Sequence, residues 1–391
     1  MTNTQRISFT KLTQKQAAAA AARHEMLYAG RMGGARAVFA FCDLSGLDLS
    51  GRNLADADFT GAILEETNLA GAKLETTSFF GADLRRANLA GASLRRADLR
   101  GASLRGSNLI GADLYEADLR EGTIAEKDRF GNLRVLQHDV GPSELPNALL
   151  NSANLENADL SGCNLTGAEM NGTILIGANL ARAVFDGVDL STALTDAPSG
   201  REIQSLSAPI TELLDAHSRW VETDGRDGRP VDLTKIDLRG LKSLAHRSLT
   251  ALVAPGATLY GLDLQGALLQ GSNLQGADLR GTRLSGADLR GVNLSGALLN
   301  NADLRDAKLG PLLISDARLL PARLDGAQAR YADFRGADLS RAKLSEADLA
   351  YANLNGADLR DTDLGSAILS GTKLPSILSE NHGALPLANA G

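Results

Sequence analysis

The sequence predicts an all-β solenoid, a chain that turns a corner every five residues and stacks the resulting coils. A large apolar residue recurs at every fifth position from Leu44 to Ile124, from Leu155 to Leu190 and from Leu259 to Leu374, with only Ala329 out of character. A small residue precedes the large one by two places, and Gly often follows it by two. A period of five matches neither the 3.6 residues of a helical turn nor the alternation of a strand. Self-similarity at a fixed period indicates a repeat architecture.

Each part of the five-residue unit has a physical reason. We expect the large and the small residue to point inward and the polar residues between them to face water. A glycine such as Gly61, Gly71 or Gly81 suits a tight turn, because the absent Cβ relieves crowding there. One unit cannot bury its large residue alone, so stability must come from stacking on its neighbours.

These units resemble the pentapeptide-repeat family, whose pattern is a small residue, Asp or Asn, Leu or Phe, a variable residue and Gly. Ala82-Asp83-Leu84, Ala277-Asp278-Leu279-Arg280-Gly281 and Ala337-Asp338-Leu339 match it residue for residue. The resemblance covers about 245 of the 391 residues. It implies a right-handed quadrilateral β-helix in two arrays, in which four units make one square coil. Successive coils would stack at the spacing of paired strands, about 4.8 Å.

The array is interrupted twice, which divides the chain into five parts. Residues 126–150 lack the five-residue periodicity of large apolar residues, which we call the beat. They also contain Pro142 and Pro146, so we expect a surface loop or short hairpin there. The beat is also absent from 192–257, and Ser243–Pro255 reads as an irregular junction. The predicted parts are an N-terminal cap helix and lead-in (1–41), a first array with a loop at 126–150 (42–192), a linker with a second cap helix at about 207–223 (193–257), a second array (258–375) and a C-terminal tail (376–391).

Two helical stripes precede the two arrays. The second consists of Ile210, Leu213, Leu214, His217, Trp220 and Val221; the first, 193 residues earlier, consists of Ala17, Ala20, Ala21, His24, Leu27 and Tyr28. An open solenoid end exposes unpaired strand edges and an apolar cross-section, so we expect each helix to cap one array. Leu47 and Arg52, which replace small residues near the start of the first array, fit a coil that is covered.

Composition excludes several classes of protein. The net charge is −7, which disfavours direct nucleic-acid binding, and no stretch approaches 18 consecutive apolar residues, as a membrane span would require. The N-terminus lacks the basic and then apolar build of a secretory signal. Cys42 and Cys163 both fall on the small inward position, as expected for reduced core cysteines of a cytoplasmic protein.

No enzyme motif is present. The five histidines (His24, His138, His217, His246 and His382) do not lie at metal-ligand spacing with one another, with Cys or with paired carboxylates. Nucleophile-elbow, phosphate-loop and dinucleotide motifs are absent. We therefore expect no enzymatic activity, metal, cofactor or small-molecule substrate, and look for function on the surface.

Residues 20 apart should lie above one another on adjacent coils, so surface stripes can be read from the sequence. One stripe, Asp263, Arg283, Asp303, Arg323, Lys343 and Asp363, mostly alternates in sign and is expected to stabilise neighbouring coils. A candidate basic patch comprises Arg85, Arg86, Arg95, Arg96, Arg100, Arg105 and Arg120, although Asp residues are interspersed with it. A candidate partner surface comprises Pro311, Leu312, Leu313, Leu320, Tyr331 and Tyr351, and its residues Pro311, Tyr331 and Tyr351, 20 apart, are expected to share one stripe. The alternative is that the tyrosines are partly buried and repair a weak coil at Ala329.

Two functions fit these features. The first is a non-catalytic scaffold that presents a surface to a protein partner, with homodimerisation if the Tyr331 and Tyr351 surface is a self-contact. The second follows from the family resemblance, since some pentapeptide-repeat proteins imitate duplex DNA and inhibit or protect topoisomerases such as DNA gyrase. Charge separates the two only weakly, because a polyanion mimic needs a dense negative strip and the array 257–375 is nearly neutral.

Overall fold

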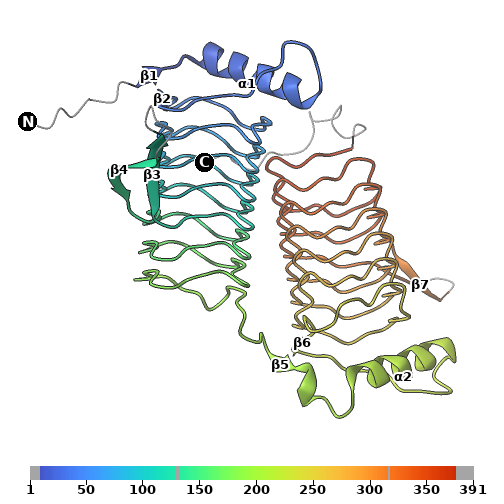
Figure 1. Cartoon of the computed structure of the whole chain (residues 1–391). Helices are drawn as coiled ribbons and strands as arrows, with labels where there is room; N and C mark the ends of the chain where they lie inside the picture. The colour runs from blue at the N-terminus through green and yellow to red at the C-terminus, as the bar shows by residue number, and fades with distance from the viewer. Residues whose placement is uncertain (1–8, 128–132, 316–317, 376–391) are drawn as a thin grey trace, which may run out of the picture. The chain divides into compact units, whose positions relative to one another are not determined.

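The computed structural model describes residues 9–127, 133–315 and 318–375 (Figure 1). The chain divides into two compact units, Met1–Ala197 and Pro198–Gly391. Each unit has its own hydrophobic core, formed by the inward residues of its stacked coils. The expected tail at 376–391 lies outside the described residues.

The square coil is confirmed by its pairing register. Asp43 bridges to Ile63 and Ile63 to Asp83 in parallel, so each residue lies against the one 20 places later. The inward residues are buried, for example Ala62 and Leu64 at 0% exposure. Figure 1 shows the coils stacked within each array. Backbone bonds along the stack, such as the one from Leu64 N–H to the Asp83 carbonyl at 2.7 Å, satisfy polar groups of the coil.

Each corner of the coil requires left-handed backbone geometry. Every fifth residue from Phe41 to Glu116 has a φ of about +60°, and Gly61 is one of them at +61°. Glycine adopts this geometry without the steric cost that a Cβ carries. The glycine of the repeat is therefore a corner residue, as the sequence indicated.

Each array begins with a short strand and a helix. In the first unit β1 (Thr10–Lys11) pairs in parallel with β2 (Cys42–Asp43), and α1 (Gln14–Tyr28) begins with a capping box between Thr13 and Gln16. In the second unit β5 (Arg201–Glu202) pairs with β6 (Ile236–Asp237), and the 3₁₀ helix η1 (Ile203–Ser205) precedes α2 (Ile210–Glu222). Each helix lies across the first coil of its own array (Figure 1).

The buried faces of the helices follow the sequence stripes in part. Ala17, Ala21 and His24 of α1 are buried, as are Ile210, Leu213, Leu214 and His217 of α2. Leu27 and Tyr28, which the stripe placed on the buried face of α1, are instead 47% and 46% exposed. They lie in the last turn of the helix, where Tyr28 reaches out to hydrogen-bond the Ala55 carbonyl at 2.9 Å.

The interruption of the first array begins and ends earlier than the expected 126–150. It is a hairpin of β3 (Gly122–Lys127) and β4 (Leu133–Val140), paired antiparallel. The ladder resumes where Ser103 bridges to Glu144, 41 residues later instead of 20. Leu145 and Leu150 are again fully buried inward residues. The extra 21 residues are one more than four units, which explains why the beat shifts by one place in the sequence.

The expectation of an irregular junction at Ser243–Pro255 is wrong. Ser243 bridges to Asp263 and Ser248 to Leu268, and Leu244 and Leu249 are buried. The second array therefore begins near Val231 and not at 258. Its first coil holds one additional residue, because Asp237 bridges to Thr258 across 21 positions, and this single residue hides the beat.

A second hairpin interrupts the second array without changing the beat. It consists of β7 (Leu312–Ser315) and β8 (Arg318–Leu320), paired antiparallel. Asn293 bridges to Arg323 across 30 positions, so ten residues, two complete units, are inserted. Ile314 and Leu319, which the beat counted as inward, are 52% and 43% exposed.

The inserted hairpin also corrects the charged stripe. Asp263, Arg283 and Asp303 do lie on successive coils, but Asp303 bridges to Asp333. Arg323, Lys343 and Asp363 lie on a different ladder, which runs through Asn293. The stripe read from the sequence is therefore two stripes on different faces.

Candidate interaction surfaces

The hairpin β7–β8 is anchored by one pair of leucines and exposes another. Leu312 pairs with Leu320 across the two strands, and Leu313 with Leu319. Leu312 and Leu320 pack over a glycine corner: a methyl group on Gly291 would lie 2.8 Å from Leu312 Cβ and 3.1 Å from Leu320 Cδ2. The opposite face of a hairpin points away from its support, because successive side chains alternate.

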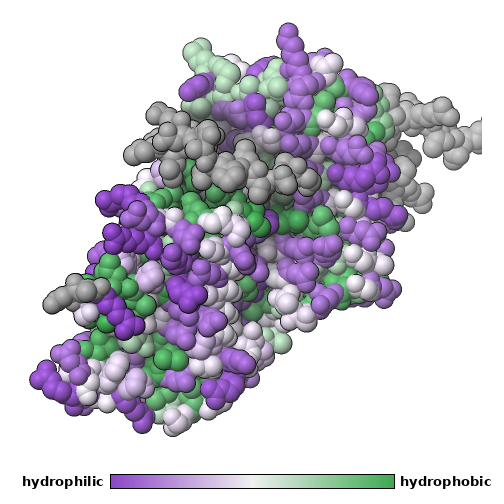
Figure 2. All heavy atoms as spheres, turned by 180° about the vertical axis from the view of Figure 1, so that it is seen from behind, coloured by the Kyte–Doolittle hydropathy of each residue, from purple (hydrophilic) through white to green (hydrophobic). Residues whose placement is uncertain are grey.

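The outward face of this hairpin is apolar. Leu313 is 63% exposed and Leu319 lies opposite it on the same face, while Ile314, at the register irregularity between Leu313 and Ser315, is exposed beside them. We call Leu313, Ile314 and Leu319 the hairpin surface. Figure 2 shows hydrophilic and hydrophobic side chains interspersed over the face that it presents. Against such a mixed background, three adjacent exposed aliphatic residues on a two-stranded projection form a concentrated apolar feature.

The two tyrosines form a stack at another corner. The rings of Tyr331 and Tyr351 lie 5.0 Å apart and nearly parallel, at 6°. Both side chains are half-buried, and burial raises the pKa of the Tyr331 hydroxyl well above its ordinary value. Both residues have left-handed backbone geometry, at φ +59° and +61°. This arrangement is the partly buried aromatic stack that the sequence left open as the alternative.

The structure separates the residues of the expected partner surface into two groups. Pro311, Leu312, Leu313 and Leu320 belong to the hairpin, which leaves the array at the corner where Gly291 bonds the Gly310 carbonyl. The tyrosines follow Asn301, whose N–H bonds the Arg330 carbonyl. Two units, half of a four-sided coil, separate Gly291 from Asn301. Placing Pro311 on the tyrosine stripe was wrong, because the ten inserted residues shift the register.

The arginines of the candidate basic patch are paired with carboxylates. Ion pairs join Arg85 to Asp83 (2.6 Å), Arg86 to Glu66 (3.0 Å), Arg95 to Asp113 (2.8 Å), Arg96 to Glu116 (2.5 Å), Arg100 to Asp98 (2.7 Å), Arg105 to Glu144 (3.6 Å) and Arg120 to Asp118 (2.8 Å). Arg95 also lies over the Tyr115 ring, and Arg100 over Phe80. Each positive charge therefore has a negative neighbour, which weakens the attraction of this surface for an anionic partner.

The carboxylates of the Asp-Leu-Arg units are neutralised in the same way. In Asp-Leu-Arg units the carboxylate accepts hydrogen bonds from the backbone N–H two residues later and from Nε and Nη2 of the arginine, as in Asp303 with Arg305. These bonds from Arg305 hold the pKa of Asp303 below its usual range. The same geometry recurs at Asp98, Asp278 and Asp358. Carboxylates held in such pairs do not form an uninterrupted negative strip.

The structure brings no catalytic constellation together in the part of the chain that it describes. Those residues contain no group of three or more His, Cys, Asp or Glu side chains that could hold a metal ion. Cys163 is buried, and burial raises the pKa of its thiol to about 12, so the thiolate is disfavoured. No helix among the described residues combines the length and apolar character of a membrane span.

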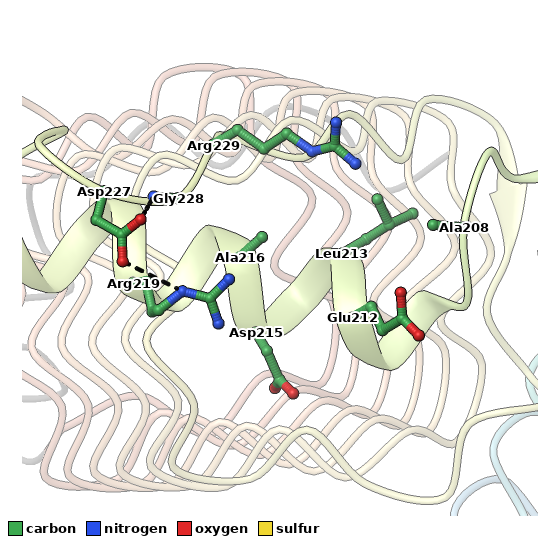
Figure 3. A pocket seen from close by; sticks show the side chains of 9 residues that line it. All are labelled: Ala208, Glu212, Leu213, Asp215, Ala216, Arg219, Asp227, Gly228 and Arg229. Carbon is green, nitrogen blue, oxygen red and sulfur yellow. Dashed lines mark hydrogen bonds and ion pairs between the residues drawn. The ribbon is translucent and has the colours of Figure 1, made fainter.

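A cavity of about 520 Å³ lies against α2 (Figure 3). Arg219 and Asp227 form an ion pair at 3.5 Å, which lies at one end of the lining in Figure 3, and Glu212, Asp215 and Arg229 also line the cavity. Gly228 closes the turn onto the helix, where a Cβ would overlap the Ala216 carbonyl. The cavity walls are therefore the helix and the turn that fixes it to the array.

Comparison with known proteins gave a family and a set of similar structures. The family model for pentapeptide repeats matches eight times, at residues 38–79, 82–120, 153–191, 256–286, 287–310, 315–345, 322–361 and 342–375. Together these ranges cover more than half of the chain. A search of curated proteins found no match.

The similar solved structures include pentapeptide repeat proteins from several sources. HetL, involved in heterocyst differentiation regulation in the cyanobacterium Nostoc sp. strain PCC 7120, is 24% identical over 90% of this chain and 95% of its own, with a TM-score of 0.14. A trypsin-treated variant of QnrB1, a plasmid-mediated fluoroquinolone resistance protein, is 19% identical over 78% and 97%, with a TM-score of 0.22. A thylakoid-lumen protein of Arabidopsis thaliana is 30% identical over 39% and 63%, with a TM-score of 0.13.

The repeat pattern, the 20-residue coil and the family match agree. This chain belongs to the pentapeptide repeat family and folds as a right-handed quadrilateral β-helix.

Proposed function

We propose that this protein is a non-catalytic β-solenoid scaffold that binds a protein partner through the hairpin surface of β7–β8. The observation that carries the proposal is the exposed trio Leu313, Ile314 and Leu319. The coil beneath is complete without the hairpin, since Asn293 bridges directly to Arg323. The ten inserted residues are therefore not needed to close the solenoid, and their exposed apolar side chains are free for binding.

The partner that suits this surface is a protein with an apolar groove. Aliphatic side chains gain affinity by leaving water, at about 25 cal/mol per Å² of buried apolar area. The anchor formed by Leu312 and Leu320 over Gly291 holds the hairpin in place before binding, which reduces the ordering cost. A few well-buried residues at the centre of an interface dominate its energy.

Imitation of duplex DNA is the competing function, and the ion pairs weigh against it. A polyanion mimic attracts its partner through unpaired negative charge. Here the carboxylates of the Asp-Leu-Arg units are bonded to their own arginines, as Asp278 is to Arg280 at 2.6 Å. A DNA-binding topoisomerase therefore serves as a defined alternative outcome of the experiment below.

The experiment compares affinity capture by three forms of the full chain. The variant Leu313→Ser/Leu319→Ser removes the apolar pair, and Ile368→Ser is the control, because Ile368 is an aliphatic residue of the array itself whose exposure, 46%, is close to the 43% of Leu319. We expect the hairpin variant to weaken capture of the partner roughly thirtyfold, a loss of about 2 kcal/mol, while the control retains it.

The same experiment has two contradicting outcomes. Capture that is unchanged by Leu313→Ser/Leu319→Ser would remove the hairpin from the interface. Recovery of topoisomerase subunits by all three forms, with loss of binding at raised salt, would favour the DNA-mimic function instead. A photo-crosslinking residue at position 313, compared with one at 368, then identifies which surface touches the captured protein.

A further inference from the structure

Each cap helix is tied to its array by a buried histidine, and the two ties differ. The His24 ring accepts the Ala37 N–H at Nδ1 (3.1 Å), and its Nε2 lies 2.8 Å from the Ala55 carbonyl. The His217 ring accepts the Val231 N–H at Nδ1 (3.2 Å). Its Nε2 is buried without a hydrogen-bond partner among the described residues. Both side chains have 0% exposure.

The geometry assigns the protonation state of both rings. A nitrogen that accepts a backbone N–H carries no proton, so each imidazole is neutral with its proton on Nε2. A second proton would have to sit on Nδ1. At His217 that proton would face the N–H of Val231, and two donors would then oppose each other. Protonation therefore breaks the bond that ties α2 to the first strand of the second array.

The charged surroundings of the two histidines are unequal. A positive charge on His24 would face the Asp56 carboxylate, which hydrogen bonds from Thr76 and Tyr28 keep ionised by lowering its pKa. Tyr28 itself lies beside the ring, 5.0 Å away. These groups offer the first helix a partial compensation for protonation.

At His217 only the backbone of Thr250 and Leu249, and no carboxylate, favours the charged ring. The charged residues around it are paired with one another: Asp215 with Arg247 at 2.9 Å, and Asp227 with Arg219 on the near face of α2 in Figure 3. The ring packs 5.6 Å from Trp220, an uncharged neighbour. The remaining charged residues on these elements are Glu212 and Glu222 of the helix and Asp224, Arg226 and Arg229 of the following turn.

We infer that His217 is an acid-sensitive latch: its protonation releases the α2 cap from the second array while the α1 cap stays in place. The released end would expose the inward leucines of the first coil, such as Leu233 and Leu238, and its unpaired strand edge. The cap then acts as a reversible cover over an apolar surface.

The direction of the pH effect follows from burial. Burial lowers the pKa of His217 below its ordinary value of 6.5. The backbone of Thr250 and Leu249 acts in the opposite direction and raises this pKa, but by less than burial lowers it. The unfolded chain therefore binds more protons than the folded chain just below about pH 6.5, and stability falls as pH falls through this range. Above about pH 6.5 the ring is neutral in both states and the latch is fully closed.

The test is hydrogen exchange of the full-length protein, compared between α1 and α2. When the pH is lowered from about 7.5 to about 5, we expect the protection factors of α2 to fall and those of α1 to stay unchanged. The fall should be roughly tenfold for every unit by which burial lowers the pKa of His217. His217→Gln, which can accept the Val231 N–H but does not titrate, should abolish the fall. His24→Gln is the matched control and should leave the fall in α2 unchanged.

Two results would overturn the latch. One is equal protection of α2 at both pH values in the wild-type protein; the other is an undiminished fall in His217→Gln. If His217→Gln fails to form α2 even at about pH 7.5, the titration of the His217 ring in the wild-type protein is measured by NMR instead. A His217 ring signal that titrates at or above about 6.5 would then refute the proposal, and one that titrates below it with loss of α2 protection supports it.

Discussion

The Asp or Asn before each inward Leu has a structural role that explains its recurrence. Asn68 Oδ1 accepts the N–H of Ala70, two residues later, and Asp98 accepts that of Arg100 in the same way. These amides do not bond to a neighbouring coil, so the side chain satisfies a donor that the turn leaves free. Acidity in this protein is therefore first a consequence of coil geometry. Counting acidic residues along the sequence is a poor guide to a negative binding surface.

The tyrosine stack leads to a prediction at the residue scale. Burial raises the pKa of Tyr331 well above its ordinary value of 10, so the folded state keeps the hydroxyl protonated where the unfolded state loses the proton. The resulting contribution to stability is present below about pH 10 and is lost as pH rises beyond it.

We expect Tyr331→Phe, which has no proton to lose, to reduce this alkaline loss. The measurement is the free energy of unfolding in urea at about pH 9 and at about pH 11, for the wild-type protein and the variant. Equal losses in both proteins would show that Tyr331 does not titrate differently on unfolding.

At the scale of the element, the two caps are built alike. Arg52 of the first array bonds Glu25 of α1 at 2.9 Å, and Arg247 of the second bonds Asp215 of α2 at 2.9 Å. Arg52 breaks the small-residue pattern because its side chain bonds α1, through Glu25 and the Ala18 carbonyl. The sequence indicated a covered coil at Arg52, whereas Arg247 was hidden by the one-residue shift before it.

The turn after each helix supplies a second prediction. In both units a glycine presses against the helix: Gly34 against the backbone of Leu27, and Gly228 against the Ala216 carbonyl. Gly228 also has a φ of +80°. We expect Gly228→Ala to detach the turn from α2. The loss in the free energy of unfolding should be well above the roughly 1–2 kcal/mol that left-handed geometry alone costs an alanine.

The control for this change is Gly276→Ala. Gly276 has a φ of +63°, but nothing lies within 4 Å of the place that its Cβ would take. Its loss of unfolding free energy, measured by urea denaturation, should therefore be limited to the backbone term. If both variants lose the same amount, the close approach at Gly228 has no energetic consequence.

At the scale of the whole molecule, the two units have separate cores. Leu99 belongs to the core of the first unit and Leu279 to that of the second, and both are 0% exposed. A carboxylate at either position would be buried without a partner, at a cost of several kcal/mol. Because each coil contacts only its neighbours, the damage should stay within one array.

We therefore expect Leu99→Asp to unfold the first unit and leave the second folded, and Leu279→Asp to do the reverse. Limited proteolysis followed by mass spectrometry distinguishes the two, since the surviving fragment should map to residues after 197 or before 198 respectively. Loss of both units in either variant would show that they fold as one cooperative body. A soluble variant with an unchanged β-rich spectrum would contradict the inward placement of the leucine.

The sequence by itself determined the cross-section of the coil, its core and the two helices α1 and α2. Inward and outward positions repeat every five residues, so burial of Leu64 or Ala62 follows from local composition alone. The outcome at Ile314 was different. Ten inserted residues keep the phase of the beat, and Ile314 has the spacing of a core residue although it is 52% exposed on a hairpin.

Only the tertiary structure decided which residues lie above one another. A strand's neighbour in a solenoid is set by the number of residues in the intervening coil, and this number is 20, 21, 30 or 41 at different places in this chain. For that reason the sequence could name Leu313 and Tyr331 as surface residues but placed their two groups on one stripe. The pairing of residues on adjacent coils depends on the length of the whole coil and not on any local pattern. This pairing places Leu313 and Tyr331 on different parts of the array.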